Sequence, residues 1–443
     1  MNRKPHPLST IIWVLALAAL GCGCNRSPAP DEPQPLLTAS TELARPVQRA
    51  RVRNVPPASQ LPIYGLKVSD AHWSQLQGTS YSDRTYPATF LAGGEIYENA
   101  RVRYRGAWAR GWPKKPLKIF FDKEKEFRGL RCLNLNSGWR DPAFIREPVA
   151  YHIYAACGVP APKARLVRLE LNGEFHGVYV EVEQPDKSFL TRNNLKGAAV
   201  YKASSRRNQS DERDLGGAES FAQHYEKQTG EKNNFNDLQE FCHELQASTN
   251  AWEFFNQRVD LDRYINYLAA SVLTQNWDGF NKNHFLVHDT KGSGKWFVVP
   301  WDLDRTLGDH WNQSFEEAEL PVLLGTSESP GITGWNRLQN IFFSDATLAT
   351  QFLDRLEQLI QTEFTKEKLS PIISELAAQS KDDLAFDREQ WPRPGFERGV
   401  EALSEFVANR RRFLLSQIPQ LRPRFIQLKP VAASNVQPPS ARP

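Results

Sequence analysis

The alternation of apolar and polar residues repeats every two residues in the first part of the chain, as in β-strands, and about every 3.6 residues in the second part, as in helices. Short β-favouring runs occupy the first part. The clearest pair, at 164–171 and 176–183, flanks Asn172-Gly173, a dipeptide typical of a tight hairpin turn. The pattern predicts an α+β fold with a β-rich N-terminal part and a mainly helical C-terminal part.

The helical pattern begins at 141–157. Asp141 followed by Pro142 is typical of a helix start, and Pro148 predicts a break or kink near Glu147. The charged, Gly-containing stretch 208–234 has neither period and is expected to be a mobile insertion. Later helices are expected at 235–245, 252–273, 335–340, 348–364, 369–379 and 400–416.

The N-terminus has the pattern of an export signal. Arg3 and Lys4 precede an apolar run at 8–20, which is shorter than a usual membrane span. A small residue before Cys22 resembles a bacterial lipoprotein processing site, although Leu20 stands two rather than three positions before this cysteine. We expect lipidation at Cys22, with Cys24, simple cleavage or a retained signal anchor as alternatives. The protein is therefore expected to be exported to the cell envelope as a lipid-anchored lipoprotein.

These patterns predict the domain organisation. We expect a signal at 1–24, a Pro-rich disordered tether at 25–61, a folded domain at 62–420 and a disordered Pro-rich tail at 421–443.

Composition excludes two classes of protein. The net charge of +4 and pI near 8.7, with no sustained basic block, argue against nucleic acid as a partner. After the signal only Cys132, Cys157 and Cys242 remain, an odd number that rules out a fully paired disulfide framework. The oligomeric state is left open.

Candidate chemistry gathers around a predicted hairpin with strands at 284–288 and 295–299. Carboxylates among buried-type aromatics are costly to desolvate unless a cation is bound, so this stretch indicates a metal site. If the second strand continues as an extended segment, Asp302 and Asp304 point the same way. The polar residues around this hairpin are Asp278, Asn281, Asn283, Asp302 and Asp304.

The spacing of these residues suits phosphoryl transfer. An Asp such as Asp278 orients or deprotonates the acceptor hydroxyl, an Asn five positions later binds a metal, and an Asp beyond the next hairpin holds Mg²⁺ against the phosphates. The alternative is that Asp278 and Asn283 cap turns and that Asp302 and Asp304 form salt bridges.

A basic segment precedes these acids. Arg105-Gly106 ends one predicted strand, and Lys115 and Lys118 lie on the next, which together could form a phosphate cradle. Alternation places the two lysines on opposite faces, so at most one faces a nucleotide if the strand is regular. Solvated surface lysines are the alternative.

Together these motifs resemble the CotH kinase family, the spore-coat-protein-H-like atypical kinases. The resemblance extends over roughly 63–310, and the matching segments are 102–106, 114–119, 172–179 with Glu183, 276–283, and 300–304 with Gly308. It implies a protein-kinase-like fold with an N-lobe at about 62–190 and a C-lobe at about 191–420. It also implies ATP- and Mg²⁺- or Mn²⁺-dependent phosphate transfer to Ser or Thr of an envelope or surface protein.

The resemblance implies roles for single residues. Asp278 is the expected catalytic base, and Asn283 and Asp302 are expected metal ligands. Asp304 is either a second ligand or a support for its loop. The remaining candidates are Lys115 or Lys118 and Arg105 for the triphosphate, Glu183 for adenine or ribose, Glu147 as the acidic partner of the lysine, and Asn281.

One departure from the family pattern is Ala107-Trp108, where many relatives carry small polar residues. Two other readings are a catalytically inactive CotH-like scaffold or surface protein and a metal-dependent hydrolase. Few His residues lie near the acids, which disfavours the hydrolase.

Overall fold

The N-terminal part of the fold is a closed barrel in the strand order β1-β2-β3-β4-β5-β7-β6. Parallel pairing of β1 with β6, which places Tyr64 opposite Leu169, closes it. Aromatic side chains such as Tyr64, Phe90 and Phe127 fill the interior. The strands are β1 (Ile63–Lys67), β2 (Tyr86–Ala92), β3 (Glu95–Tyr104), β4 (Leu117–Phe120), β5 (Cys132–Asn136), β6 (Ala164–Leu171) and β7 (Glu174–Val182).

This computed structural model describes residues 58–204, 209–310, 318–331, 334–392 and 396–428. The predicted signal at 1–24, with Cys22, and most of the predicted tether lie outside the described residues. Within the described part of the chain, every helix is too short or too polar to span a bilayer.

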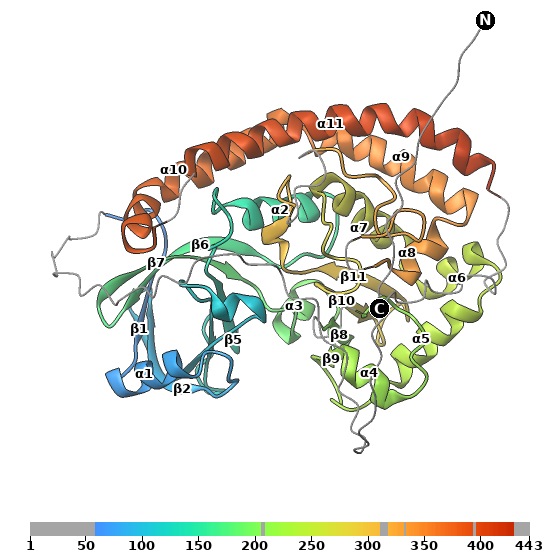
Figure 1. The fold of residues 1–443 in the computed structure, drawn as a ribbon. Coiled ribbons are helices and arrows are strands. Elements are labelled where there is room, and N and C mark those ends of the chain that lie inside the picture. Colours follow the sequence, from blue (N-terminus) through green and yellow to red (C-terminus); the bar gives the residue numbers. More distant parts are fainter. Residues whose placement is uncertain (1–57, 205–208, 311–317, 332–333, 393–395, 429–443) are drawn as a thin grey trace, which may run out of the picture. The chain divides into compact units, whose positions relative to one another are not determined.

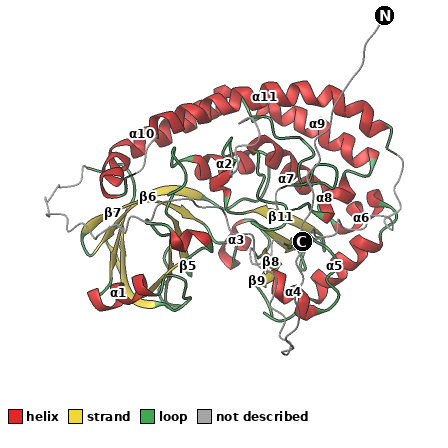
Figure 2. Ribbon diagram, in the orientation of Figure 1, coloured by secondary structure: helices red, strands yellow, loops and turns green. Residues whose placement is uncertain are grey.

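The C-terminal part is mainly helical, as the sequence pattern predicts (Figures 1 and 2). It contains a four-stranded sheet in the order β11-β10-β8-β9. Its strands are β8 (Ala199–Ala203), β9 (Tyr225–Lys227), β10 (His284–His288) and β11 (Trp296–Pro300). The predicted hairpin is present as β10 and β11, with Phe285 opposite Val299.

Helices pack around this sheet and against each other in one apolar core. Short helices α1 (Asp70–Gly78) and η1 (Trp108–Gly111) belong to the barrel. The remaining α-helices are α2 (Arg146–Ala156), α3 (Lys187–Arg192), α4 (Ala218–His224), α5 (Asn236–Ala247), α6 (Ala251–Arg258), α7 (Leu261–Thr274), α8 (Arg337–Phe342), α9 (Ala346–Thr362), α10 (Lys366–Gln390) and α11 (Phe396–Ile426).

The start of α2 differs from the prediction. The helix begins at Arg146, and the Asp141 carboxylate instead accepts hydrogen bonds from the backbone N–H groups of Ala143 (2.9 Å) and Arg146 (2.8 Å). Pro148 therefore lies in the first turn, where a missing N–H is tolerated, and does not break the helix.

Four other predictions are wrong. The segment expected as one helix at 252–273 forms two, α6 and α7, because Asp260 caps a new N-terminus. The described part of the predicted mobile insertion, 209–234, contains α4 and β9. Helix α11 continues to Ile426, past the predicted start of the tail at 421, and Leu61 at the predicted tether's end is buried.

A fully buried ion pair fastens α10 to the barrel. Lys114 Nζ donates to Asp387 Oδ2 (2.5 Å) and to the Val178 carbonyl (2.5 Å), and the Val178 N–H donates to the same carboxylate oxygen (2.8 Å). Gly177 permits this approach, because a Cβ there would lie 2.6 Å from Asp387 Oδ2. Figure 1 shows α10 crossing from the helical part to β6 and β7.

Asp387→Ala is expected to lower the free energy of unfolding by about 3–5 kcal/mol, because it leaves the Lys114 charge buried without its carboxylate. Replacing both partners, Lys114→Met with Asp387→Leu, should cost clearly less. Urea denaturation measures both changes. Equal losses in the single and double variants would contradict this account of the pair.

The ring of His176 predicts a pH effect on stability. It lies among Trp73, Tyr179 and Trp391, and burial followed by the nearby Lys114 charge lowers its pKa to about 3. In the unfolded chain this imidazole takes up a proton below about pH 6.5, whereas in the folded protein it stays neutral. The free energy of unfolding should therefore fall as the pH drops from 7 to 5, by about 1–2 kcal/mol from this group.

The measurement is urea denaturation at pH 7 and pH 5 for the wild type and for His176→Phe. The variant should lose less stability between the two pH values than the wild type. The same loss in both proteins would show that His176 does not contribute to the acid sensitivity.

Candidate functional site

The loop between α7 and β10, residues 275–283, brings Asp278 and Asn283 together. Asn283 Nδ2 donates to Asp278 Oδ2 (2.9 Å), and Lys282 Nζ pairs with Asp278 Oδ1 (3.0 Å). Burial raises the pKa of Asp278, and the Lys282 ammonium partly offsets this. The spacing identified Asp278 and Asn283 as neighbours, but it gave no indication of Lys282.

Asp302 and Asp304 do not lie on an extended segment, contrary to the prediction. Asp302 has φ = 60° and begins the 3₁₀ turn η2 (Leu303–Arg305) directly after β11. Its backbone N–H donates to the Tyr151 hydroxyl (3.2 Å). Asp302 is exposed and Asp304 half-buried. Burial, and then the Asp302 charge, raise the pKa of Asp304 well above its ordinary value.

Glu147 lies in the first turn of α2 and is buried. Both of its carboxylate oxygens accept from Asn136 Nδ2 (3.0 and 2.8 Å), and the amide oxygen of Asn136 accepts from Arg105. Burial followed by the Asp302 charge raises the pKa of Glu147 to about 8. In the described part of the chain Glu147 pairs with no lysine, so the predicted Lys–Glu contact is replaced by a link through Asn136.

Arg105 and Lys118 share the edge of the barrel that faces these acids. The Arg105 guanidinium carbon lies 5.6 Å from the centre of the Trp301 ring, next to Asp302. Lys118 Nζ donates to Gln184 Oε1 (3.1 Å), and burial lowers the pKa of Lys118.

Lys115 is directed elsewhere. Its Nζ donates to the Trp112 carbonyl (2.7 Å) and lies 5.9 Å from the centre of the Tyr104 ring. The structure therefore groups Lys118, rather than Lys115, with Arg105.

Two further candidates have other partners. The Glu183 carboxylate pairs with Arg192 (2.6 Å) and accepts from the Lys163 N–H (3.0 Å), which closes the connection from β7 to α3. The neighbouring Gln184 is the residue that reaches Lys118. Asn281 is buried, and its carbonyl accepts from the Ser210 N–H (3.0 Å).

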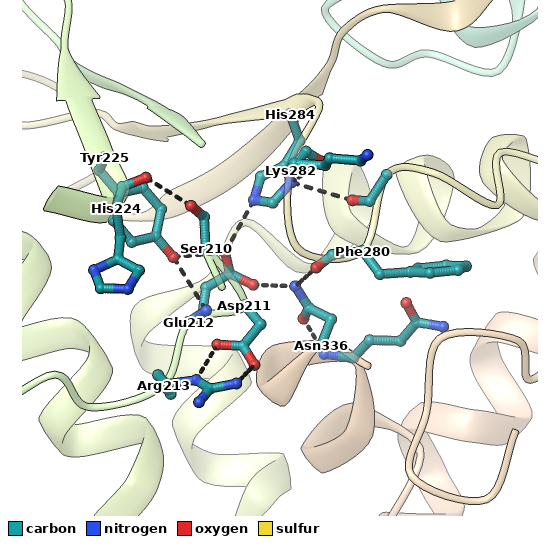
Figure 3. Close-up of polar contacts among 12 residues, drawn as sticks. Ser210, Asp211, Glu212, Arg213, His224, Tyr225, Phe280, Lys282, His284 and Asn336 are labelled. Carbon is teal, nitrogen blue, oxygen red and sulfur yellow. Dashed lines mark hydrogen bonds and ion pairs between the residues drawn. The ribbon is translucent and has the colours of Figure 1, made fainter. Parts of the chain in front are cut away.

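Beneath the α7–β10 loop lies a polar cluster that the sequence did not reveal (Figure 3). Glu212 Oε1 accepts from His284 Nε2 (2.9 Å), and Asn336 Nδ2 donates to Glu212 Oε2. Burial alone would lower the pKa of His284, but the Glu212 carboxylate outweighs it and the pKa is raised. Glu212 belongs to the stretch that lacked apolar periodicity, so only its partners mark it as important.

The residues present suit a divalent cation. Burial, followed by the Asp302 charge, raises the pKa of both Glu147 and Asp304, and a cation bound beside these carboxylates would relieve the repulsion. Carboxylate and amide oxygens are the ligands that Mg²⁺ prefers. Among the described residues, no group of three or more His, Cys, Asp or Glu side chains is already gathered tightly enough to hold a metal.

Comparisons with known proteins agree with this arrangement. The model of the family described as CotH kinase protein matches residues 102–414. Inner spore coat protein H of Bacillus subtilis (strain 168) is 28% identical over 363 residues, which cover 80% of this chain and 97% of that protein. An inner spore coat protein H-like protein of the same organism is 22% identical over 258 residues, covering 57% of this chain and 69% of that protein.

A crystal structure of the Helicobacter pylori proinflammatory kinase CtkA is a more remote match. It has a TM-score of 0.36 and 14% identity, and the match covers 69% of this chain and 94% of that one. No residue assignment follows from a likeness at this level. The family match, by contrast, spans most of the chain and includes the end of β3 with Arg105, the α7–β10 loop and the Asp302 turn. The chain therefore belongs to the CotH kinase family.

Proposed function

We propose that the protein is an exported kinase that transfers the γ-phosphate of ATP to Ser or Thr of an envelope or surface protein. The observation that carries this proposal is that basic side chains of the barrel face acidic side chains of the helical part. Arg105 and Lys118 come from the barrel, whereas Asp278, Asn283 and Asp302 come from the helical part. Arg105 is linked to Glu147 through Asn136. The Asp302 charge also contributes to the raised pKa of Glu147. The basic side chains and the acidic side chains therefore lie next to each other.

The proposed chemistry follows from the side chains. The acceptor hydroxyl oxygen forms a bond to the γ-phosphorus, the bond from that phosphorus to the bridging oxygen of ADP breaks, and Asp278 takes the hydroxyl proton. Asn283 and Lys282 fix the orientation of the Asp278 carboxylate. Arg105 and Lys118 supply positive charge to the phosphates.

A bound Mg²⁺ or Mn²⁺ would neutralise charge on the phosphates while the γ-phosphoryl group is transferred. Asp302 and Asp304 are the carboxylates proposed to hold it. The Asn283 amide nitrogen donates a hydrogen bond to Asp278, so the amide oxygen is the atom proposed to bind the cation.

The cellular location is proposed from the N-terminal sequence alone. Arg3, Lys4, the apolar run at 8–20 and Cys22 support export and lipid anchoring in the envelope. The acceptor would then be a protein of the same compartment.

Purified wild-type protein should transfer labelled phosphate from ATP to a protein acceptor in the presence of Mg²⁺ or Mn²⁺. Asp278→Asn should reduce the rate about 100-fold or more, because it removes the proton acceptor. Asp302→Asn should abolish the metal-dependent stabilisation by ATP, which for the wild type is about 3 kcal/mol at 100 times Kd. Radiolabel incorporation and thermal unfolding measure the two effects.

Asp382→Asn is the matched control, since Asp382 is an exposed carboxylate on α10 away from the site. It should behave as the wild type in both assays. A wild type that neither binds ATP with metal nor transfers phosphate would favour an inactive scaffold. Full labelling by both Asp278→Asn and Asp302→Asn would overturn the assigned roles.

The two lysines provide a second, paired test. Lys118→Met should weaken ATP binding about 10- to 100-fold, because a charge-assisted hydrogen bond to phosphate contributes about 1.5–3 kcal/mol. Lys115→Met should change the Kd less than about threefold, since its ammonium group is held by the Trp112 carbonyl. Calorimetric titration with MgATP distinguishes the two. The reverse order of effects would assign the triphosphate to Lys115.

A further inference from the structure

The backbone of the α7–β10 loop is held by hydrogen bonds on its inner side. Consecutive carbonyls of this loop, from 279 to 283, each accept from a donor outside the loop, which is either the adjoining His284 or a group from a distant segment. The contacts are His284 Nδ1 to Gly279 O (3.1 Å) and Lys282 O (3.0 Å), Asn336 Nδ2 to Phe280 O (2.7 Å), Ser210 N to Asn281 O (3.0 Å) and Trp301 N to Asn283 O (3.1 Å).

Three of these contacts depend on groups that Glu212 anchors. Its carboxylate binds His284 through one oxygen and Asn336 through the other, as Figure 3 shows. The side chains of Glu212 and His284 are each only 2% exposed, so water cannot replace a lost partner easily. Both nitrogens of the His284 ring are engaged, Nδ1 by the Gly279 and Lys282 carbonyls and Nε2 by the Glu212 carboxylate, so the ring orientation is fixed from both sides.

Packing alone does not fix this loop. A cavity of about 40 Å³ lies behind it, lined in part by Glu212, Gln275, Gly279, Phe280 and His284. Asn283 has a left-handed backbone, with φ = 57°, a conformation that Asn adopts more readily than most residues. Directed hydrogen bonds from His284 and Asn336, both held by Glu212, therefore add to the packing of Phe280 in restraining the loop on this side.

We propose that Glu212 and Asn336 are positioning residues for phosphoryl transfer. They hold His284 and the loop carbonyls, and the loop in turn presents Asp278 and Asn283 to the substrates. Neither residue contacts the side chain of Asp278 or Asn283. This inference rests on the proposed kinase function, and it assigns a role to a segment, 209–212, that carries no recognised motif.

Glu212→Gln is the central test. The amide keeps the shape of the side chain but directs an NH₂ group at one of two donors, His284 Nε2 or Asn336 Nδ2. We expect kcat to fall about 10- to 100-fold, as is typical when a support of a reactive group is lost. KM for ATP should change less than about threefold, because Arg105 and Lys118 on the barrel are untouched.

Asn336→Ser provides a second variant in case Glu212→Gln fails to fold. Serine keeps the N-cap of α8, where Asn336 Oδ1 accepts from the Gln339 N–H (2.9 Å), but it cannot reach Glu212 or the Phe280 carbonyl. We expect kcat to fall about tenfold or more with helix α8 intact.

Tyr225→Phe is the matched control. The Tyr225 hydroxyl donates to the same Glu212 Oε1 (3.3 Å) and accepts from the Glu212 N–H (3.1 Å), but it does not touch the loop. Its loss should lower stability while leaving kcat within about twofold of the wild type. A fall in kcat as large as that of Glu212→Gln would mean that any disturbance of this cluster matters, and would overturn the positioning role.

Hydrogen exchange of the peptide 276–286 gives a readout that does not require activity. Exchange should be faster in Glu212→Gln and Asn336→Ser than in the wild type, and unchanged in Tyr225→Phe. If the wild type transfers no phosphate, the proposed function fails, whereas the exchange data still decide whether Glu212 holds the loop. The inference would be overturned if Glu212→Gln and Asn336→Ser both showed the exchange rate and the kcat of the wild type. A rise in KM with an unchanged kcat would also overturn it.

Discussion

The buried ion pair between Lys114 and Asp387 is the contact on which the placement of the site depends most. Lys114 precedes β4, the strand that carries Lys118, and Asp387 lies on α10 in the helical part. Two charges without water are stable only when every hydrogen bond is made, and the Val178 carbonyl and N–H complete this set. The pair thus fixes the barrel against the helices, and with it the distance between the cations of one part and the carboxylates of the other.

The charges near the site are divided in the way that phosphate transfer requires. Arg105 and Lys118 belong to the barrel, and Asp278 and Asp302 belong to the helical part. Asn136 connects the two sides, because its amide binds Arg105 at one end and Glu147 at the other. The pKa of Glu147 is raised first by burial and then by the Asp302 charge. A cation and a triphosphate together would balance both sides.

The sequence predicted the parts of the site that depend on short-range order. A hairpin between two short strands brings its ends together, so the spacing made Asp278, Asn283 and Asp302 candidates, and the family resemblance suggested their roles. Alternation does not decide between Lys115 and Lys118, because Lys115 lies before β4; their different positions follow from their partners, the Trp112 carbonyl and Gln184. The left-handed backbone of Asp302 was missed, because nothing local requires φ > 0 at an Asp.

Glu212 could not be found in this way, since its partner His284 lies 72 positions further along the chain. The segment around it has the composition of a mobile loop, and only the fold shows that it passes beneath the loop that carries the proposed catalytic residues. A chain can therefore retain Asp278, Asn283 and Asp302 and still lack the support that orients them. Under the proposed positioning role, whether a sequence with these motifs encodes an active kinase or an inert scaffold would depend on a buried Glu–His–Asn cluster as well as on the proposed reactive residues.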